Sequence, residues 1–256
     1  MINAYVTLGL SLVMAFAIFL SMPIVFYRKL TTRQMLFLNA GAIGILVFLL
    51  MDIYGDVAAV FGNNTILNPY LIIFMAGFVL MYLFFVTPKS SRDPEENPKR
   101  TSTLAAIGIG FQNLTEGLLF GSAGAAGLVS IYVLSITAFT LQNFTEGFPI
   151  AAPLMGMKRK VEKRFMAGAF LIGGLPTVMG TVIGLVFFSN YFLVFFDGLA
   201  SAAILYVVFV LFHVNINRGA REAKDQKEKS NYIWLTYIGI LVGFVIAYIL
   251  NYAIAY

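Results

Sequence analysis

Eight long apolar runs constrain this chain more than any other feature of its sequence. A helix that crosses the hydrocarbon core of a bilayer needs about 20 mostly apolar residues, and runs of this kind follow one another from end to end. Segments of about ten residues with alternating polarity would instead be typical of a membrane barrel. We therefore expect an all-α integral membrane protein with eight transmembrane helices. The expected spans are residues 4–27, 35–61, 69–87, 102–123, 128–153, 166–188, 192–213 and 232–256.

The positions of the basic residues predict the orientation of these helices. All 17 Lys and Arg residues lie in the connections after the first, third, fifth and seventh spans, and the connections between these hold none. Basic connections stay in the cytoplasm, so we expect both termini outside. The formal net charge of +5 then reflects these connections and not a nucleic-acid partner. We interpret residues 1–256 as one transmembrane transport domain with cytoplasmic linkers at about 88–101 and 214–231.

Composition narrows the chemistry that such a domain can perform. The chain is 60% hydrophobic and 11% charged, whereas soluble domains average about 25% charged residues. It has no Cys and a single His, His213. Disulfides and thiolate metal sites are therefore excluded, and so is a zinc site built from several imidazoles.

One polar motif occurs twice within the apolar runs, as "QNLTEG" at residues 112–117 and as "QNFTEG" at residues 142–147. In each copy the Gln and the Asn precede the Glu by four and three residues, so the three side chains share one helix face. The two helices run antiparallel through a short connection, which makes them expected neighbours. Face to face, they offer amide and carboxylate oxygens, a hard ligand set for a divalent cation. The candidate metal ligands are Gln112, Asn113, Glu116, Gln142, Asn143 and Glu146.

Further acidic residues lie inside the expected spans. An ionised acid at the centre of a membrane helix costs about 2.5–3.5 kcal/mol on translocon scales, and no Lys or Arg lies within a span to pair with one. We interpret Asp52, Asp56 and Asp197, on the outer side, as an entrance vestibule that concentrates cations. Ordinary contact with interfacial water is the alternative. His213, near the inner end of the seventh span, is an exit ligand or a solvated side chain.

Glycine and proline accompany the two motifs. Gly117 and Gly147 directly follow the two Glu residues, and Pro149 and Pro153 are expected to interrupt the fifth helix. Broken helices of this kind often mark binding sites in transporters. The alternative is that the amides hold helices together while the glycines permit close packing.

The eight helices, the outer termini and the paired motifs resemble the Zrt/Irt-like (ZIP) family of divalent metal transporters. In its GufA-like branch the fourth helix carries His-Asn-x-Pro-Glu-Gly and the fifth carries Gln-Asn-x-Pro-Glu-Gly. The resemblance implies a ZIP-like bundle in which the six candidate ligands occupy metal positions. This chain departs from the pattern: Gln112 replaces the histidine, Thr replaces Pro in both motifs, and Thr177 stands where the family has Glu. Amide oxygen in place of imidazole favours manganese, iron(II) or magnesium over zinc.

We therefore expect a cell-membrane transporter that moves a divalent metal of the zinc, iron and manganese class toward the cytoplasm. It would not be an enzyme and would need no cofactor besides the transported ion. Its partners would be the ion and the lipid bilayer, and the small-residue segment "GSAGAAG" at 121–127 permits a homodimer. One alternative is a proton-linked carrier of another cation, in which Glu116 and Glu146 titrate. Another is an intramembrane aspartyl-type enzyme that uses Asp52 or Asp56 with Asp197.

Overall fold

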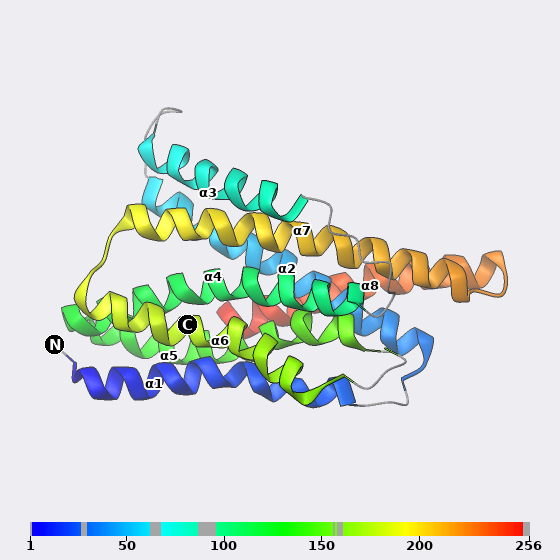
Figure 1. The fold of residues 1–256 in the computed structure, drawn as a ribbon, viewed down its shortest axis with the longest axis horizontal. Coiled ribbons are helices and arrows are strands. Elements are labelled where there is room, and N and C mark those ends of the chain that lie inside the picture. Colours follow the sequence, from blue (N-terminus) through cyan, green and yellow to red (C-terminus); the bar gives the residue numbers. More distant parts are fainter. Residues whose placement is uncertain are drawn as a thin grey trace.

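The computed structural model describes residues 2–26, 30–61, 68–86, 96–155, 157 and 161–252. Within these ranges every regular element is a helix, and eight α-helices follow the order of the predicted spans (Figure 1). The prediction of an all-α chain is thus confirmed. The α-helices are α1 (Ala4–Ala17), α2 (Thr32–Phe61), α3 (Pro69–Val86), α4 (Glu96–Ala126), α5 (Val129–Ala151), α6 (Lys163–Val186), α7 (Asn190–Glu222) and α8 (Gln226–Tyr252).

Two 3₁₀ segments extend the first and fifth helices. η1 (Ile18–Phe26) continues α1 and contains Pro23, and η2 (Ala152–Leu154) closes α5 and contains Pro153. Pro149 lies inside α5 without ending it, so the expected interruption at Pro149 does not occur. Its ring only withholds the backbone N–H that would otherwise bond the carbonyl four residues earlier.

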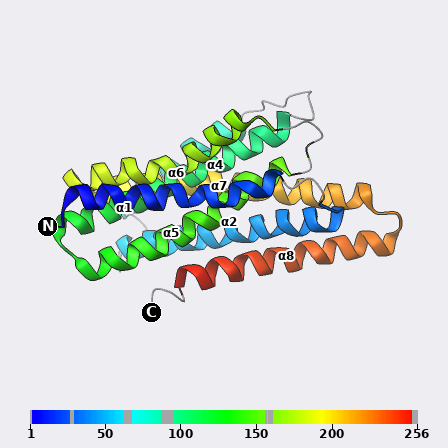
Figure 2. The same cartoon turned by 90° about the horizontal axis from the view of Figure 1, so that it is seen from below.

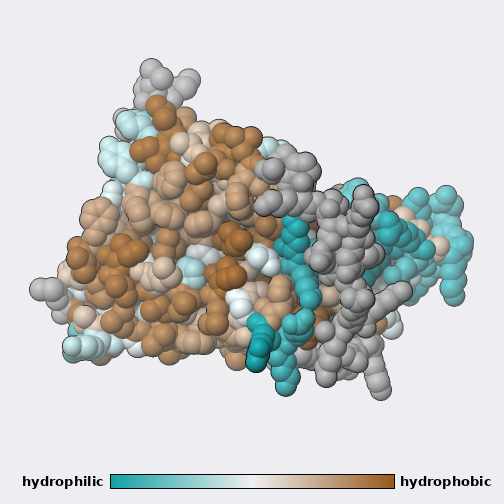
Figure 3. Space-filling view, in the orientation of Figure 1, coloured by the Kyte–Doolittle hydropathy of each residue, from teal (hydrophilic) through white to brown (hydrophobic). Residues whose placement is uncertain are grey.

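Helices extend past the apolar runs at one end of the molecule. The segment 214–231, expected to be a linker, is helical except for residues 223–225, and α4 already begins at Glu96. Hydropathy marks where a helix leaves an apolar environment, not where its backbone hydrogen bonds stop. Hydrophilic residues gather at this end (Figure 3). We call it the basic end because α2, α4, α6 and α8 begin there and α7 ends there, and the Lys and Arg residues of the described chain lie at these helix ends or between α7 and α8.

Five of the helices are long and apolar enough to cross a membrane. They are α1 with the start of η1 (Ala4–Pro23), α2, α6, α7 and most of α8. Helix α3 is apolar but shorter, while α4 and α5 contain the polar motifs, which lower their hydropathy. Large apolar side chains cover the outside, for example Trp234 and Leu241 of α8, which are 64% and 62% exposed. This surface is compatible with a membrane-embedded protein.

Helix α4 holds the central position. It contacts α5, α6 and α7, while α2 pairs with α8 and α3 pairs with α7; Figure 2 shows the helices running along one common axis. The contact between α4 and α6 is made backbone to backbone. A Cβ at Gly180 would collide with the carbonyl oxygen of Leu114 and lie 2.8 Å from the Leu118 nitrogen. Gly117 and Gly184 meet the facing backbone in the same way.

Glycines of the segment 121–127 pack within the chain. A Cβ at Gly121 would lie 3.0 Å from the backbone nitrogen of Leu185 on α6, and one at Gly124 would lie 3.2 Å from the Thr7 hydroxyl on α1. These two glycines therefore serve contacts of α4 with α6 and α1.

We predict that Gly180→Ala destabilises the protein by about 1–3 kcal/mol, because the added methyl group forces α4 away from α6. The measurement is thermal unfolding of the purified protein in detergent. Gly168→Ala on the same helix is the matched control, since a Cβ there meets nothing within 4 Å. Alanine is favoured over glycine in a helix by about 1 kcal/mol, so this control should be neutral or stabilising. Equal melting temperatures for the two variants would contradict the close packing of α4 on α6.

Candidate functional site

The structure brings the two polar motifs face to face between α4 and α5. Gln142 Nε2 donates to Oε1 of Glu146 at 3.2 Å and also to Oε1 of Glu116. Gln112 Nε2 donates to the same Glu116 oxygen at 3.2 Å, and Asn113 Nδ2 donates to Oε2 of Glu146 at 2.8 Å. Each carboxylate therefore accepts hydrogen bonds from both helices, and Gln142 joins the two carboxylates through one amide nitrogen. We call these five residues and Asn143 the amide–carboxylate cluster.

Helix α6 forms a third wall of the cluster. Asn113 Nδ2 also donates to the carbonyl oxygen of Gly173 on α6 at 2.9 Å. Gly173 itself packs closely against α5 and η1, since a Cβ there would lie 2.8 Å from Ile150 Cδ1 and 3.0 Å from Ile18 Cδ1. Asn143 differs from its counterpart Asn113: its amide donates within α5, to the carbonyl oxygen of Phe139 at 2.9 Å.

The threonine of each motif forms the same local bond. The hydroxyl groups of Thr115 and Thr145 donate to the carbonyl oxygens of Gln112 and Gln142, each at 2.7 Å. A proline at these positions would remove a backbone donor, whereas threonine keeps it. Helices α4 and α5 are accordingly continuous α-helices through both motifs.

The glycine of each motif permits close packing. A Cβ at Gly117 would lie 3.0 Å from the backbone nitrogen of Thr181 on α6, and one at Gly147 would lie 2.5 Å from the carbonyl oxygen of Ile18 on η1. Each Glu of the motifs is thus followed by a point where another backbone touches its helix. The structure thus supports the interpretation that Gly117 and Gly147 permit close packing of helices.

All six cluster residues are buried, with at most 5% of the side chain exposed. Four of their oxygen atoms have no hydrogen-bond partner: Oε1 of Gln112, Oδ1 of Asn113, Oε2 of Glu116 and Oδ1 of Asn143. Buried polar atoms in folded proteins are nearly always partnered. The unused atoms are all acceptors, while the amide nitrogens are bonded to carboxylates and carbonyls. Carboxylate and amide oxygens with lone pairs to spare are the ligands that hard cations take in proteins.

No basic side chain balances the two glutamates in the part of the chain that the structure describes. The ion pairs seen there, Lys99 with Glu162 and Arg218 with Glu222, lie at the basic end. Arg100 precedes Gln112 on α4 by about 18 Å of helix rise. The described ranges also contain no group of three or more His, Cys, Asp or Glu side chains able to hold a metal. A metal bound here would therefore need amide oxygens in addition to the two carboxylates.

The predicted vestibule residues lie around the cluster. Asp52 and Asp56 of α2 are near enough to Glu116 to interact with it electrostatically, and Asp56 is exposed while Asp52 is half-buried. Asp197 of α7 is only 3% exposed, and its carboxyl group lies beside the Thr115 hydroxyl. Asp52 and Asp56 are also near enough to Asp197 to interact with it electrostatically, so these two residues lie within reach of both Glu116 and Asp197.

His213 does not join this region. It is exposed on α7, where its Nε2 atom lies 2.8 Å from the Asn217 amide. Sixteen residues separate it from Asp197, about 24 Å along the helix. The predicted exit ligand is therefore remote from the other candidate residues.

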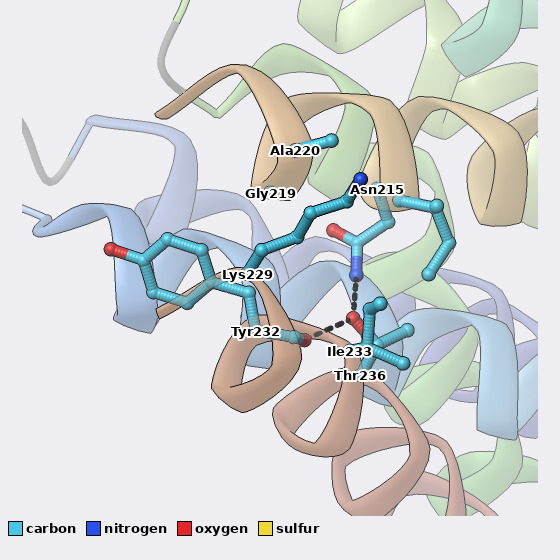
Figure 4. Close-up of a pocket in the computed structure, with 8 residues that line it drawn as sticks. Asn215, Gly219, Ala220, Lys229, Tyr232, Ile233 and Thr236 are labelled. Atoms are coloured by element: carbon cyan, nitrogen blue, oxygen red, sulfur yellow. Dashed lines mark hydrogen bonds between the residues drawn. The ribbon is translucent and has the colours of Figure 1, made fainter. Parts of the chain in front are cut away.

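Two pockets of the structure are lined by residues outside the amide–carboxylate cluster. Near the basic end, a cavity of about 10 Å³ lies between α7 and α8 (Figure 4). There Asn215 donates to the Thr236 hydroxyl at 3.0 Å and to the Leu36 carbonyl oxygen at 3.2 Å, which ties α7 to α8 and α2. This cavity is the size of one water molecule. A cleft of about 420 Å³ between α2 and α3 is lined by apolar and aromatic side chains such as Phe61 and Phe74.

Sequence reasoning missed Ser201, which is fully buried on α7 and whose hydroxyl oxygen has no hydrogen-bond partner. A usable signal was present, because Ser201 follows Asp197 by four residues and must share its helix face. Thr115 was also missed, because a lone hydroxyl in an apolar run carries little information.

A scan against protein-family models and a search of curated proteins find no match for this chain. The fold and the site together define an all-helical, membrane-compatible bundle with a buried amide–carboxylate cluster. The resemblance to the ZIP family rests on the two motifs and the order of the helices.

We predict that Asn113→Ala lowers stability more than Asn143→Ala. The first change leaves a Glu146 oxygen and the Gly173 carbonyl without their shared donor, at about 1–3 kcal/mol for an unsatisfied buried group. The second removes a bond to a carbonyl that remains within the α5 backbone ladder. Thermal unfolding of both variants without added divalent ions tests this, and equal losses would show that Asn113 does not link α5 and α6.

Proposed function

We propose that this chain is a divalent metal cation transporter that binds its substrate ion between α4 and α5. The observation that carries the proposal is the amide–carboxylate cluster: two buried glutamates with no described basic partner, in a group where four buried oxygen atoms have no hydrogen-bond partner. Two carboxylate charges balance one divalent ion. Isolated buried charges are otherwise strongly unfavourable.

The donor atoms bear on which ion is carried. The cluster supplies carboxylate and amide oxygens, and the chain has no Cys and one remote His. Such a set favours manganese, iron(II) or magnesium over zinc. A ZIP-like bundle of eight spans with both termini outside is the arrangement that we propose for it, with the helix-4 histidine of that family replaced by Gln112.

Gln142 has a specific part in this mechanism. Its amide nitrogen now lies between the two carboxylates, the position that a bridging cation would take. An amide nitrogen donates hydrogen and does not coordinate a cation, whereas the amide oxygen does. Binding would rotate the Gln142 amide so that Oε1 faces the ion, and release would restore the bonds from Nε2 to both glutamates.

The route runs along the acidic residues. An ion would enter past Asp56 and Asp52, whose negative potential concentrates cations, reach Glu116 and Glu146, and leave toward the basic end when the surrounding helices move. Alternating access by one group of helices against another is common in transporters. Transport toward the basic end is inward if the basic connections are cytoplasmic.

A proton-linked carrier of another cation is the second candidate. The observation that favours it is the Gln142 bridge, because two buried carboxylates on one amide donor form a site where a proton can replace an ion. Transport without any effect of divalent ions would distinguish this candidate.

We predict that a divalent transition metal raises the melting temperature of the purified protein, since a ligand at 100 times its Kd stabilises by about 2.7 kcal/mol. Manganese, iron(II) under anaerobic conditions, cobalt, zinc, magnesium and calcium are compared. The double change Glu116→Gln and Glu146→Gln should abolish the shift. Glu162→Gln is the control, because this carboxylate has 73% of its side chain exposed and lies at the basic end. No shift with any of the six ions would exclude a divalent site.

We predict that residues at the two ends of the bundle face opposite sides of the membrane. The chain has no Cys, so single cysteines report the side directly. Asn190→Cys, at the start of α7, should react with a membrane-impermeant maleimide on intact cells, because this connection holds no basic residue. Lys227→Cys, at the start of α8, should react only after permeabilisation. Labelling of Lys227→Cys in intact cells would reverse the orientation, and the unaltered chain provides the blank.

A further inference from the structure

A second group of buried oxygen atoms lies on α7, beside the amide–carboxylate cluster. Asp197 is 3% exposed and Ser201 is 0% exposed. Oδ2 of Asp197 and Oγ of Ser201 have no hydrogen-bond partner. The two residues lie one turn apart on one face of the helix. Two adjacent unpartnered oxygens, one of them on a carboxylate, require a physical explanation because buried polar atoms are otherwise satisfied.

The register of α7 against α4 places these oxygens near the cluster. A Cβ at Gly108 of α4 would lie 3.0 Å from the Ala203 Cβ and 3.3 Å from the Ile204 side chain. Two turns along α4, Thr115 lies beside Asp197. Because the two helices run in opposite directions, Ser201 falls at the level of Gln112. Its Nε2 atom donates to Glu116, while its Oε1 atom has no partner. Gln112 thus stands between the two groups of oxygens.

The helices packed against Asp197 bring no positive charge to it. From α2 the titratable groups are Asp52 and Asp56, which act on Asp197 electrostatically. From α4 the polar group is the Thr115 hydroxyl, and the titratable group nearest to it in sequence is Glu116, one residue on. Helix α3 touches α7 here through the backbone of Phe74 against Gly198, and α3 contains no charged residue. Arg218 on α7 is about 31 Å further along the helix.

The composition of this second group differs from that of the first. It offers one carboxylate and two hydroxyl oxygens, and the Thr115 hydroxyl, which donates its hydrogen to the Gln112 carbonyl at 2.7 Å, has lone pairs left to give. One negative charge with neutral hard oxygens matches a monovalent cation, whereas the two glutamates match a divalent one. A proton on Asp197 would neutralise the charge at a single oxygen. A sodium ion is held by several oxygens at once, which suits the arrangement around Asp197.

We infer that Asp197, Ser201 and Thr115 form a sodium site, separate from the amide–carboxylate cluster and joined to it by Gln112. Sodium binding itself does not depend on the proposed divalent transport. Coupling between sodium and the divalent ion does rest on the proposed divalent transport. An ion at Asp197 would draw the Gln112 amide oxygen toward α7, while the Gln112 amide nitrogen holds Glu116. Coupling ions of transporters commonly bind beside the substrate site.

The test is a sodium titration of the purified full-length protein in detergent, followed by its melting temperature. Divalent ions are removed with a chelator, pH is fixed, and N-methyl-D-glucamine chloride keeps ionic strength constant. We expect a saturable rise with sodium in the unaltered protein and no rise in Asp197→Asn. In Ser201→Ala the sodium concentration at half-maximal rise should increase about tenfold, which corresponds to about 1.4 kcal/mol.

Ser122→Ala on α4 is the matched control. Its hydroxyl donates to the Leu119 carbonyl within its own helix at 2.8 Å, so its sodium response should equal that of the unaltered protein. If Asp197→Asn does not fold, the sodium titration of Ser201→Ala decides the test, since this change removes only one oxygen atom. Absence of a sodium effect, or the same half-maximal concentration in Ser201→Ala, would overturn the inference. A melting temperature that follows pH but not sodium would assign Asp197 to a proton and overturn it as well. Because no divalent ion is present, neither result depends on the divalent site.

Discussion

Two carboxylates buried without a basic partner determine what the rest of this structure must supply. Glu116 and Glu146 lie where water does not reach them, so their charge must be met by hydrogen bonds, protons or a cation. The chain gives each of them amide donors from both α4 and α5, through Gln112, Asn113 and Gln142. The two bonds that cross between the helices, from Asn113 to Glu146 and from Gln142 to Glu116, require that α4 and α5 keep their register. The amide oxygens of Gln112 and Asn113 are left without partners, which makes the site suited to a positively charged ligand.

The backbone contact between α4 and α6 is the second requirement. Because glycines meet facing backbone on both helices, the Gly173 carbonyl comes within 2.9 Å of the Asn113 amide and completes the third wall of the site. Small residues at helix interfaces are typical of membrane bundles, where lipid provides no hydrophobic force to press helices together. Helix packing and site geometry therefore depend on the same contact, since the approach of α6 to α4 also orients the Asn113 amide that donates to Glu146.

Sequence reasoning predicted the helices and the meeting of the two motifs, because apolar length and three- and four-residue spacing are local properties. It did not predict that α7 and α8 remain helical through residues 214–222 and 226–231, since hydropathy does not register polar helix. Nor did it predict that Pro149 lies within an intact α5, or that Ser201 is buried with Asp197. The spacing of Ser201 from Asp197 indicates a shared helix face, but which face meets which neighbour depends on close packing across the bundle. Span number, orientation and the ion remain predictions.

The 3₁₀ winding of η1 makes this segment longer than an α-helix of the same residues would be. Its nine residues are wound as a 3₁₀-helix, which rises about 2.0 Å per residue against about 1.5 Å in an α-helix. Rewinding all nine as α-helix would shorten the segment by about 4.5 Å. Ile18 and Ser21 of η1 lie directly against Gly147, the residue after Glu146. A change of winding in η1 would therefore rotate the η1 surface that touches α5 and shift it along the helix axis. This movement would occur next to the buried carboxylate of Glu146.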